Sequence, residues 1–142
     1  MAQDLSFTLH VLTARLDRAA DRMLRAEHDI TYSRFLALSL IGELGLSTQR
    51  ALADALGVTE PSISRMVGVL TAEGLLDPPG RTGRPRLNLT ARGKELVASV
   101  QPVLEDRFAA LVAESGVPYD EYAEHTSQLL AALARYQGEA AS

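Results

Sequence analysis

The chain has 142 residues, a formal net charge of −4, and 46% hydrophobic and 23% charged side chains, which is typical of one folded globular domain. It contains no cysteine, which excludes disulfides and thiol chemistry. The three histidines, His10, His28 and His125, lie too far apart for a helical metal site, so neither a metal nor another cofactor is expected. No apolar run approaches the roughly 20 residues that span a bilayer, and the first residues lack a secretory signal pattern, so we expect a cytoplasmic protein without a membrane partner.

The charge is distributed unevenly along the chain. Residues 46–94 have seven basic and four acidic side chains, a net of +3, whereas residues 1–45 have a net of −1 and residues 95–142 a net of −6. Phosphate binding responds to charges within about 8–10 Å, so the local field matters more than the total. The middle segment is therefore compatible with a DNA partner.

Apolar residues recur at three- and four-residue steps from Asp4 to about Glu27, which predicts a long amphipathic helix. A second helix is expected to begin near Thr31 or Ser33 and to end at Gly45, a residue type favoured after helix ends. The N-terminal third of the chain is thus predicted to be helical.

Two short helices follow, separated by a turn of only Gly57 and Val58. The first is predicted over residues 48–56. The second is expected to begin after Thr59, with Pro61 in its first turn, where the missing N–H costs nothing, and to end at Gly74.

Residues 75–90 are predicted to form a β-hairpin, because two short segments flank a reversal rich in Pro and Gly. Thr90 then resembles the cap of a long helix through about Val112, which Pro102 should bend. A last helix is expected over residues 118–137.

Two short helices with a tight turn, followed by a hairpin, predict a mainly α fold of the winged helix-turn-helix type. One helix of such a pair fits the major groove, which is about 12 Å wide. Arg65 on its outer face can pair with a guanine, whereas Thr59 serves equally well as a DNA contact or as a simple cap. The residues predicted to contact double-stranded DNA are Thr48, Arg50, Thr59, Glu60, Pro61, Ser62, Ser64, Arg65, Arg81, Arg84 and Arg86.

Three of these residues, Arg81, Arg84 and Arg86, lie close together on the hairpin without an intervening acid. Arginine suits a narrow minor groove, where the negative potential is strongest. Arg84 and Arg81 are the favoured groove contacts, while Arg86 either braces the loop or meets phosphate.

Three sequence runs resemble the MarR family of bacterial transcriptional regulators. They are TQRALADALGVT from Thr48, PSISRMVGVLTAEGLL from Pro61 and RPRLNLTARG from Arg84. The resemblance extends along the chain and implies a homodimer, in most cases a repressor, on a near-palindromic operator. In many family members the hairpin, called the wing, has an acidic residue that orients an arginine. Residues 79–86 of this chain contain no acidic residue, so which arginine enters the groove is left open.

The resemblance implies a single MarR-like domain over residues 1–142. Within it, residues 31–92 would form the DNA-binding region, and residues 1–30 and 93–142 the dimerisation helices. It also implies a pocket for a small aromatic or anionic effector. The residues that could line it are His10, Arg15, His28, Tyr32 and Phe35, although each fits equally well as a core or interface residue.

Two other functional classes can be compared with a DNA-binding regulator. The acidic total of −4 favours, as the alternative, an antirepressor or another protein-interaction module that keeps the winged-helix fold. An enzyme is disfavoured, because the sequence has no nucleophile–base constellation, glycine-rich phosphate loop or metal-ligand spacing.

Overall fold

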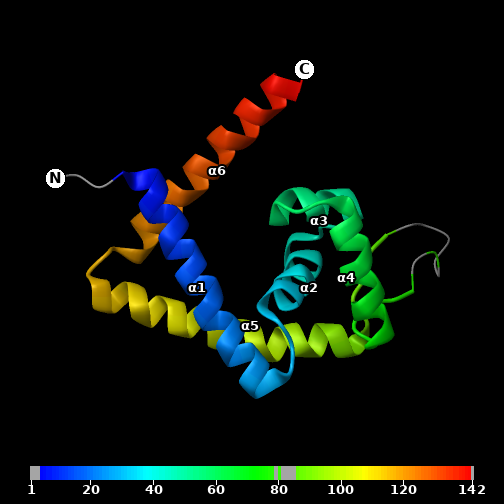
Figure 1. Cartoon of the computed structure of the whole chain (residues 1–142). Helices are drawn as coiled ribbons and strands as arrows, with labels where there is room; N and C mark the ends of the chain where they lie inside the picture. Colours follow the sequence, from blue (N-terminus) through cyan, green and yellow to red (C-terminus); the bar gives the residue numbers. More distant parts are fainter. Residues whose placement is uncertain (1–3, 79, 81–85, 142) are drawn as a thin grey trace. The chain divides into compact units, whose positions relative to one another are not determined.

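The computed structural model describes residues 4–78, 80 and 86–141, with side chains to residue 138. The described part contains six helices (Figure 1): α1 (Leu5–His28), α2 (Tyr32–Leu44), α3 (Gln49–Leu56), α4 (Glu60–Ala72), α5 (Ala91–Ser115) and α6 (Tyr119–Ala141). The chain divides into two compact units, residues 1–101 and 102–142, and the boundary falls inside α5 at Pro102.

The start of α2 is fixed by two side-chain contacts. The Thr31 hydroxyl accepts a hydrogen bond from the Arg34 N–H (3.3 Å), which makes Thr31 an N-cap. The Asp21 carboxylate on α1 accepts a second bond, from the Tyr32 N–H (2.9 Å). The α2 helix ends as predicted at Gly45, where φ is 67°. Asp21 therefore joins α1 to α2 by satisfying a helix N-terminus.

The bounds of α3 and α4 are set by N-capping threonines and by a glycine at the turn between them. The Thr48 hydroxyl accepts a hydrogen bond from the Ala51 N–H (3.1 Å), and Gly57 ends α3 with a φ of 68°. The Thr59 hydroxyl caps α4 in the same way, from the Ser62 N–H (3.3 Å). The tight turn between the two helices is thus confirmed.

The base of the predicted hairpin is present in the described residues. Leu76 and Leu89 form an antiparallel bridge, and the Asp77 N–H donates to the Asn88 carbonyl (2.9 Å). Nearby, the Leu87 N–H donates to the Ser47 carbonyl (2.7 Å), which attaches the returning segment to the start of the helix pair. The hairpin tip, at residues 79 and 81–85, lies outside the described residues.

The end of α4 agrees with the expectation, because the helix ends at Ala72 and Gly74 (φ 77°), directly after the cap residue, closes it in the left-handed conformation. The α5 and α6 helices extend further than expected, to Ser115 and Ala141.

Gly42 lies inside α2. A Cβ there would lie 2.7 Å from Leu89 Cδ1, so close packing explains the glycine.

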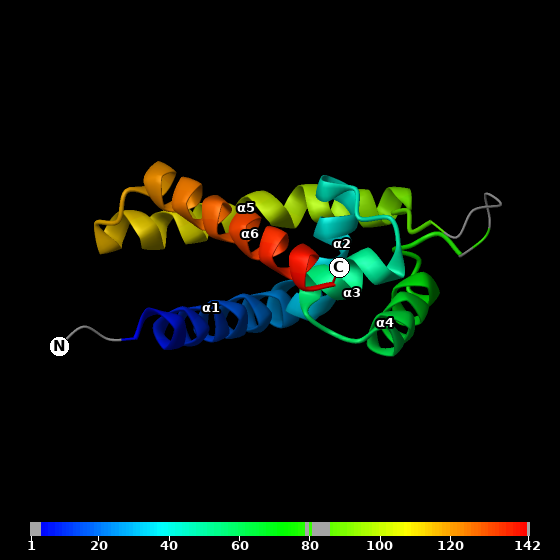
Figure 2. The same cartoon turned by 90° about the horizontal axis from the view of Figure 1, so that it is seen from above.

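Each unit has an apolar surface that its own residues leave open. In the first unit, the N-terminal half of α1 extends away from α2, α3 and α4 in both views (Figures 1 and 2), and Leu5 and Phe7 are 65% and 72% exposed. In the second unit, Leu130 and Tyr136 of α6 are 65% and 72% exposed. None of the described helices is long and apolar enough to cross a membrane.

Gly93 provides a test of the packing between the hairpin base and α5. A Cβ on Gly93 would collide with the Leu75 carbonyl oxygen, so Gly93→Ala is expected to lower the free energy of unfolding by about 1–3 kcal/mol. The matched control is Gly68→Ala, where a Cβ meets nothing within 4 Å; a helical alanine there should stabilise by about 0.5–1 kcal/mol. Urea denaturation measures both, and equal midpoints would contradict this packing.

Candidate nucleic-acid interface

The orientation of α4 follows from its buried stripe. Ile63, Val67 and Leu70 are 0%, 3% and 0% exposed, so they hold one side of the helix against the core. The opposite side is therefore directed to solvent. The predicted contact residues that are exposed on α4 are Glu60, Pro61, Ser64 and Arg65, while Ser62 is half-buried.

Arg65 is the main cation on the exposed side of α4. Its Nη2 donates to the Ser62 hydroxyl oxygen at 3.3 Å, one turn earlier in the helix. This single contact leaves most of the five guanidinium donors available. The contact of Arg65 with a guanine edge stays a prediction from the sequence.

Other predicted residues at the helix starts have local structural roles as well. Thr48 and Thr59 are exposed, and each side chain caps its helix. Glu60 is acidic in the first turn of α4, where a negative charge is favourable to the helix dipole. Arg50 is exposed on α3. In each cap the threonine hydroxyl oxygen accepts a hydrogen bond, so its O–H can still donate to another group.

The wing arginines are described only in part. Arg86 is exposed on the returning segment, directly before the buried Leu87. Arg81 and Arg84, the two favoured minor-groove contacts, lie outside the described residues. Their contacts with DNA therefore stay predictions from the sequence.

Two arginines that were not among the predicted site residues contact the far end of α4. Arg34 Nη1 on α2 lies 3.7 Å from Glu73 Oε1, and Arg92 Nη1 on α5 donates to the Glu73 carbonyl oxygen at 3.0 Å. Cations are favourable at a helix C-terminus. No local pattern marks these residues, because the fold brings them to Glu73 from 39 and 19 positions away.

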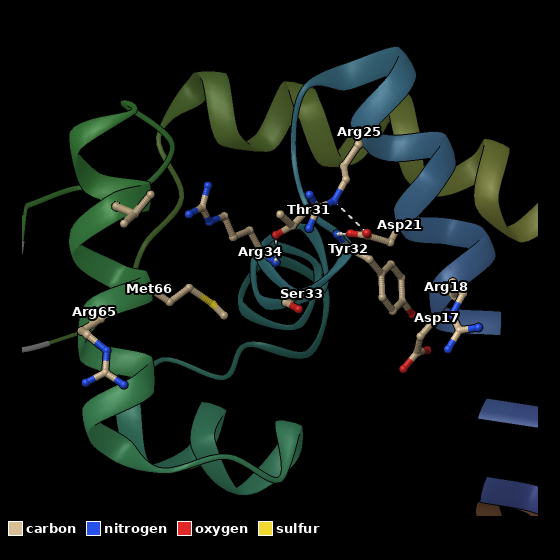
Figure 3. A pocket seen from close by; sticks show the side chains of 11 residues that line it. Asp17, Arg18, Asp21, Arg25, Thr31, Tyr32, Ser33, Arg34, Arg65 and Met66 are labelled. Carbon is tan, nitrogen blue, oxygen red and sulfur yellow. Dashed lines mark hydrogen bonds and ion pairs between the residues drawn. The ribbon is translucent and has the colours of Figure 1, made fainter. Parts of the chain in front are cut away.

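A cavity of about 540 Å³ lies between α1, α2 and α4 (Figure 3). Eleven residues line it: Asp17, Arg18, Asp21, Arg25, Thr31, Tyr32, Ser33, Arg34, Arg65, Met66 and Val69. Figure 3 shows Met66 directed from α4 towards α2, and the Tyr32 ring beside Asp17 and Arg18 of α1. The cavity thus adjoins the helix that is predicted to read bases.

The five residues predicted to bind an effector are dispersed. Tyr32 lines this cavity, and His28 lines a second one, of about 570 Å³, with residues near the end of α4 and the start of α5. Phe35 is only 1% exposed and is part of the core. His10 and Arg15 are exposed on α1 and contribute to neither of these two cavities.

Two aspartates lie on the α1 side of the cavity and have different partners. The Asp21 carboxylate already has two, because it pairs with Arg25 Nε at 2.7 Å and accepts a hydrogen bond from the Tyr32 N–H. Burial raises the pKa of the Asp17 carboxyl. Burial, and then the Asp17 charge, raise the pKa of the Tyr32 phenol, so this hydroxyl stays protonated at neutral pH and can donate a hydrogen bond.

No metal chemistry is suggested by the described residues, which contain no group of three or more His, Asp or Glu side chains placed to hold an ion. The polar groups on α4 and around the cavity include guanidinium, hydroxyl and phenol groups as well as the carboxylates of Asp17, Asp21 and Glu60. The guanidinium groups can bind anions such as phosphate and carboxylate.

The helix–turn–helix and the antiparallel bridge behind it define a mainly α protein of the winged helix-turn-helix class. Residues 28–84, which include α2, α3 and α4, match the sequence model of the MarR family. The family resemblance that the sequence runs indicated is thus confirmed over these residues. No curated protein sequence matches the chain.

Solved structures of MarR family proteins share this fold. A transcriptional regulator from Silicibacter pomeroyi is 24% identical, with a TM-score of 0.79 over 95% of this chain and 90% of its own. Staphylococcus aureus MepR, solved as a DNA complex, is 21% identical, with a TM-score of 0.71 over 95% and 99%. A Mycobacterium tuberculosis MarR family protein in complex with p-aminosalicylic acid is 21% identical, with a TM-score of 0.70 over 89% and 96%.

Thr59 provides a test that separates its observed capping role from its predicted contact with DNA. Aspartate is as good an N-cap as threonine, so Thr59→Asp should keep stability within about 0.5 kcal/mol while its charge repels phosphate. We expect DNA affinity to fall at least tenfold in fluorescence anisotropy. The matched control is Thr31→Asp at the N-cap of α2, which should keep both properties; equal DNA affinity of the two variants would contradict the assignment.

Proposed function

We propose that this protein is a cytoplasmic, homodimeric transcriptional regulator, a repressor that binds a pseudo-palindromic DNA operator and is released by a small aromatic or anionic effector. The observation that carries the proposal is the exposed side of α4, where Arg65 uses one hydrogen bond within the helix and keeps its other guanidinium donors for DNA. Thr59 caps the start of this helix, and Arg34 pairs with Glu73 at its end. The family match over residues 28–84 supports the regulatory role, and no enzymatic step is proposed.

The DNA partner is supported by the local charge and by a structural relative. The net +3 of residues 46–94 attracts phosphate, although the whole chain is acidic. MepR, which shares the fold, was solved as a DNA complex. In our proposal α4 enters the major groove, and Arg84 and Arg81 of the wing approach the neighbouring minor groove, with Arg86 near phosphate.

The homodimer is supported by the apolar surfaces on α1 and α6. Large exposed apolar patches are unusual on monomers and mark interaction sites. In our proposal residues 1–30 and 93–142 form the dimer, and residues 31–92 bind DNA. A two-fold dimer would place two α4 helices about 34 Å apart, one turn of DNA, which suits a pseudo-palindromic site.

The decisive experiment is in vitro selection of DNA with the purified protein, followed by a gel-shift assay on the selected site. Arg65→Ala should lose base discrimination at one position per half-site, at a cost of about 1–3 kcal/mol. Arg22→Ala, an exposed arginine on α1, is the matched control and should bind normally. Failure to select any salt-sensitive site would refute the proposal, and a co-purifying regulator would then favour the antirepressor function.

The dimer is tested by a charge placed on α6. Leu130→Asp is expected to dissociate the dimer into monomers in sedimentation velocity, because a carboxylate would be buried without a partner in the interface. The control is Leu44→Asp at the end of α2, which is 68% exposed and outside the proposed dimerisation helices. If the Leu130 variant remained dimeric at micromolar concentration, α6 would not be part of the interface.

A further inference from the structure

The Arg65 side chain lies back along α4, towards the end of the helix that joins α3 (Figure 3). Its Nη2 donates to the Ser62 hydroxyl oxygen at 3.3 Å, three residues earlier. Residues three apart are neighbours on a helix surface, and long side chains lean towards the helix N-terminus. The contact therefore holds the guanidinium near the first turn of α4, the part of a recognition helix whose residues face base edges in the major groove.

Ser62 is the one side-chain acceptor that the helix offers to Arg65. Four positions lie three or four residues away on α4: Pro61, Ser62, Gly68 and Val69. Among these, only Ser62 has a polar side chain. Arg65 forms no ion pair with any of the described residues. A neutral hydroxyl orients the guanidinium without neutralising it, so the full positive charge stays available to DNA.

Ser62 itself is held by the start of the helix. Its backbone N–H donates to the Thr59 hydroxyl oxygen at 3.3 Å, and the next residue, Ile63, is fully buried. The Ser62 side chain is half-buried, whereas Arg65 is exposed. The hydroxyl that accepts from Arg65 therefore belongs to a part of α4 that both the cap and the core keep in place.

The contact leaves one edge of the guanidinium group for a base. An arginine can donate two parallel hydrogen bonds from its Nε/Nη2 edge or from its Nη1/Nη2 edge, and Nη2 supplies one N–H to each. Because Ser62 takes one of the two Nη2 protons, one edge is used and the other stays complete. Guanine presents O6 and N7 as a matching pair of acceptors. Arg65 would thus meet the base with a single, defined edge.

We propose that Ser62 is a positioning residue for base recognition, which orients the Arg65 guanidinium towards guanine without contacting DNA itself. The proposal rests on the proposed DNA-binding function and specifies how its base preference arises; it replaces the direct DNA contact that the sequence predicted for Ser62. An unheld arginine would lose side-chain freedom on binding and could turn to phosphate instead. Holding the guanidinium beforehand lowers this cost and favours guanine over other bases.

The first test measures discrimination at the guanine whose recognition is lost in Arg65→Ala. Discrimination is the Kd for a site with adenine at that position divided by the Kd for the selected site, both from fluorescence anisotropy. Ser62→Ala should lower it by about two- to tenfold, the size expected for one hydrogen bond. Ser62→Thr keeps the hydroxyl and should keep the discrimination. An unchanged value in Ser62→Ala, or an equal loss in Ser62→Thr, would overturn the proposal.

A double-mutant cycle distinguishes positioning from direct contact. If Ser62 acts through Arg65, Ser62→Ala should change neither the Kd nor the discrimination in an Arg65→Ala background. A loss that adds to that of Arg65→Ala would assign Ser62 its own DNA contact and refute the positioning role. The matched control is the exposed Ser64, because helical side chains one residue apart do not face each other. Ser64→Ala should therefore have the same effect on the Kd in both backgrounds.

A stability measurement distinguishes loss of orientation from loss of structure. The N-cap uses the backbone N–H of residue 62, which Ser62→Ala keeps, and alanine has the higher helix propensity. The urea midpoint of Ser62→Ala should therefore equal or exceed that of the wild type. A midpoint that falls together with the discrimination would show a structural role for Ser62 and contradict the proposal.

A measurement without DNA keeps the two proposals separate. The NMR order parameter of the Arg65 Nε–H reports how firmly the guanidinium is held. It should fall in Ser62→Ala and stay in Ser62→Thr, while that of Arg50, exposed on α3, should not change. An unchanged Arg65 value would refute the orientation even in a protein that binds DNA. A fall in a protein that selects no DNA would refute the regulatory function and leave the Ser62–Arg65 orientation standing.

Discussion

The burial of Ile63, Val67 and Leu70 is the constraint on which the orientation of α4, and with it the proposed DNA-binding surface, depends. A helix with one stripe packed in the core has no freedom to rotate, so its opposite side is fixed towards solvent. The Thr59 cap fixes where this helix begins, and Glu73, contacted by two arginines from other helices, fixes where it ends. The exposed side of α4 is thus presented at a defined position, which sequence-specific reading of DNA requires.

Most of the fold could be predicted because its signals are local. Capping threonines, left-handed glycines and three-residue apolar spacing act within one turn of the chain, and Thr48, Gly57 and Thr59 behave as that chemistry requires. Gly74, left-handed directly after the cap of α4, ends that helix in the same way. The role of Gly42 is not local, because it depends on packing against Leu89, which is 47 positions away.

The site was predictable only where it depends on one helix. The exposed side of α4 follows from periodicity, so the exposure of Arg65 on that side could be predicted from the sequence. The cavity could not, because it exists only where three helices meet, and Tyr32 is the one effector candidate that lines it. The Asp21–Tyr32 and Arg34–Glu73 contacts join residues 11 and 39 positions apart, and no local pattern distinguishes them from ordinary surface charges.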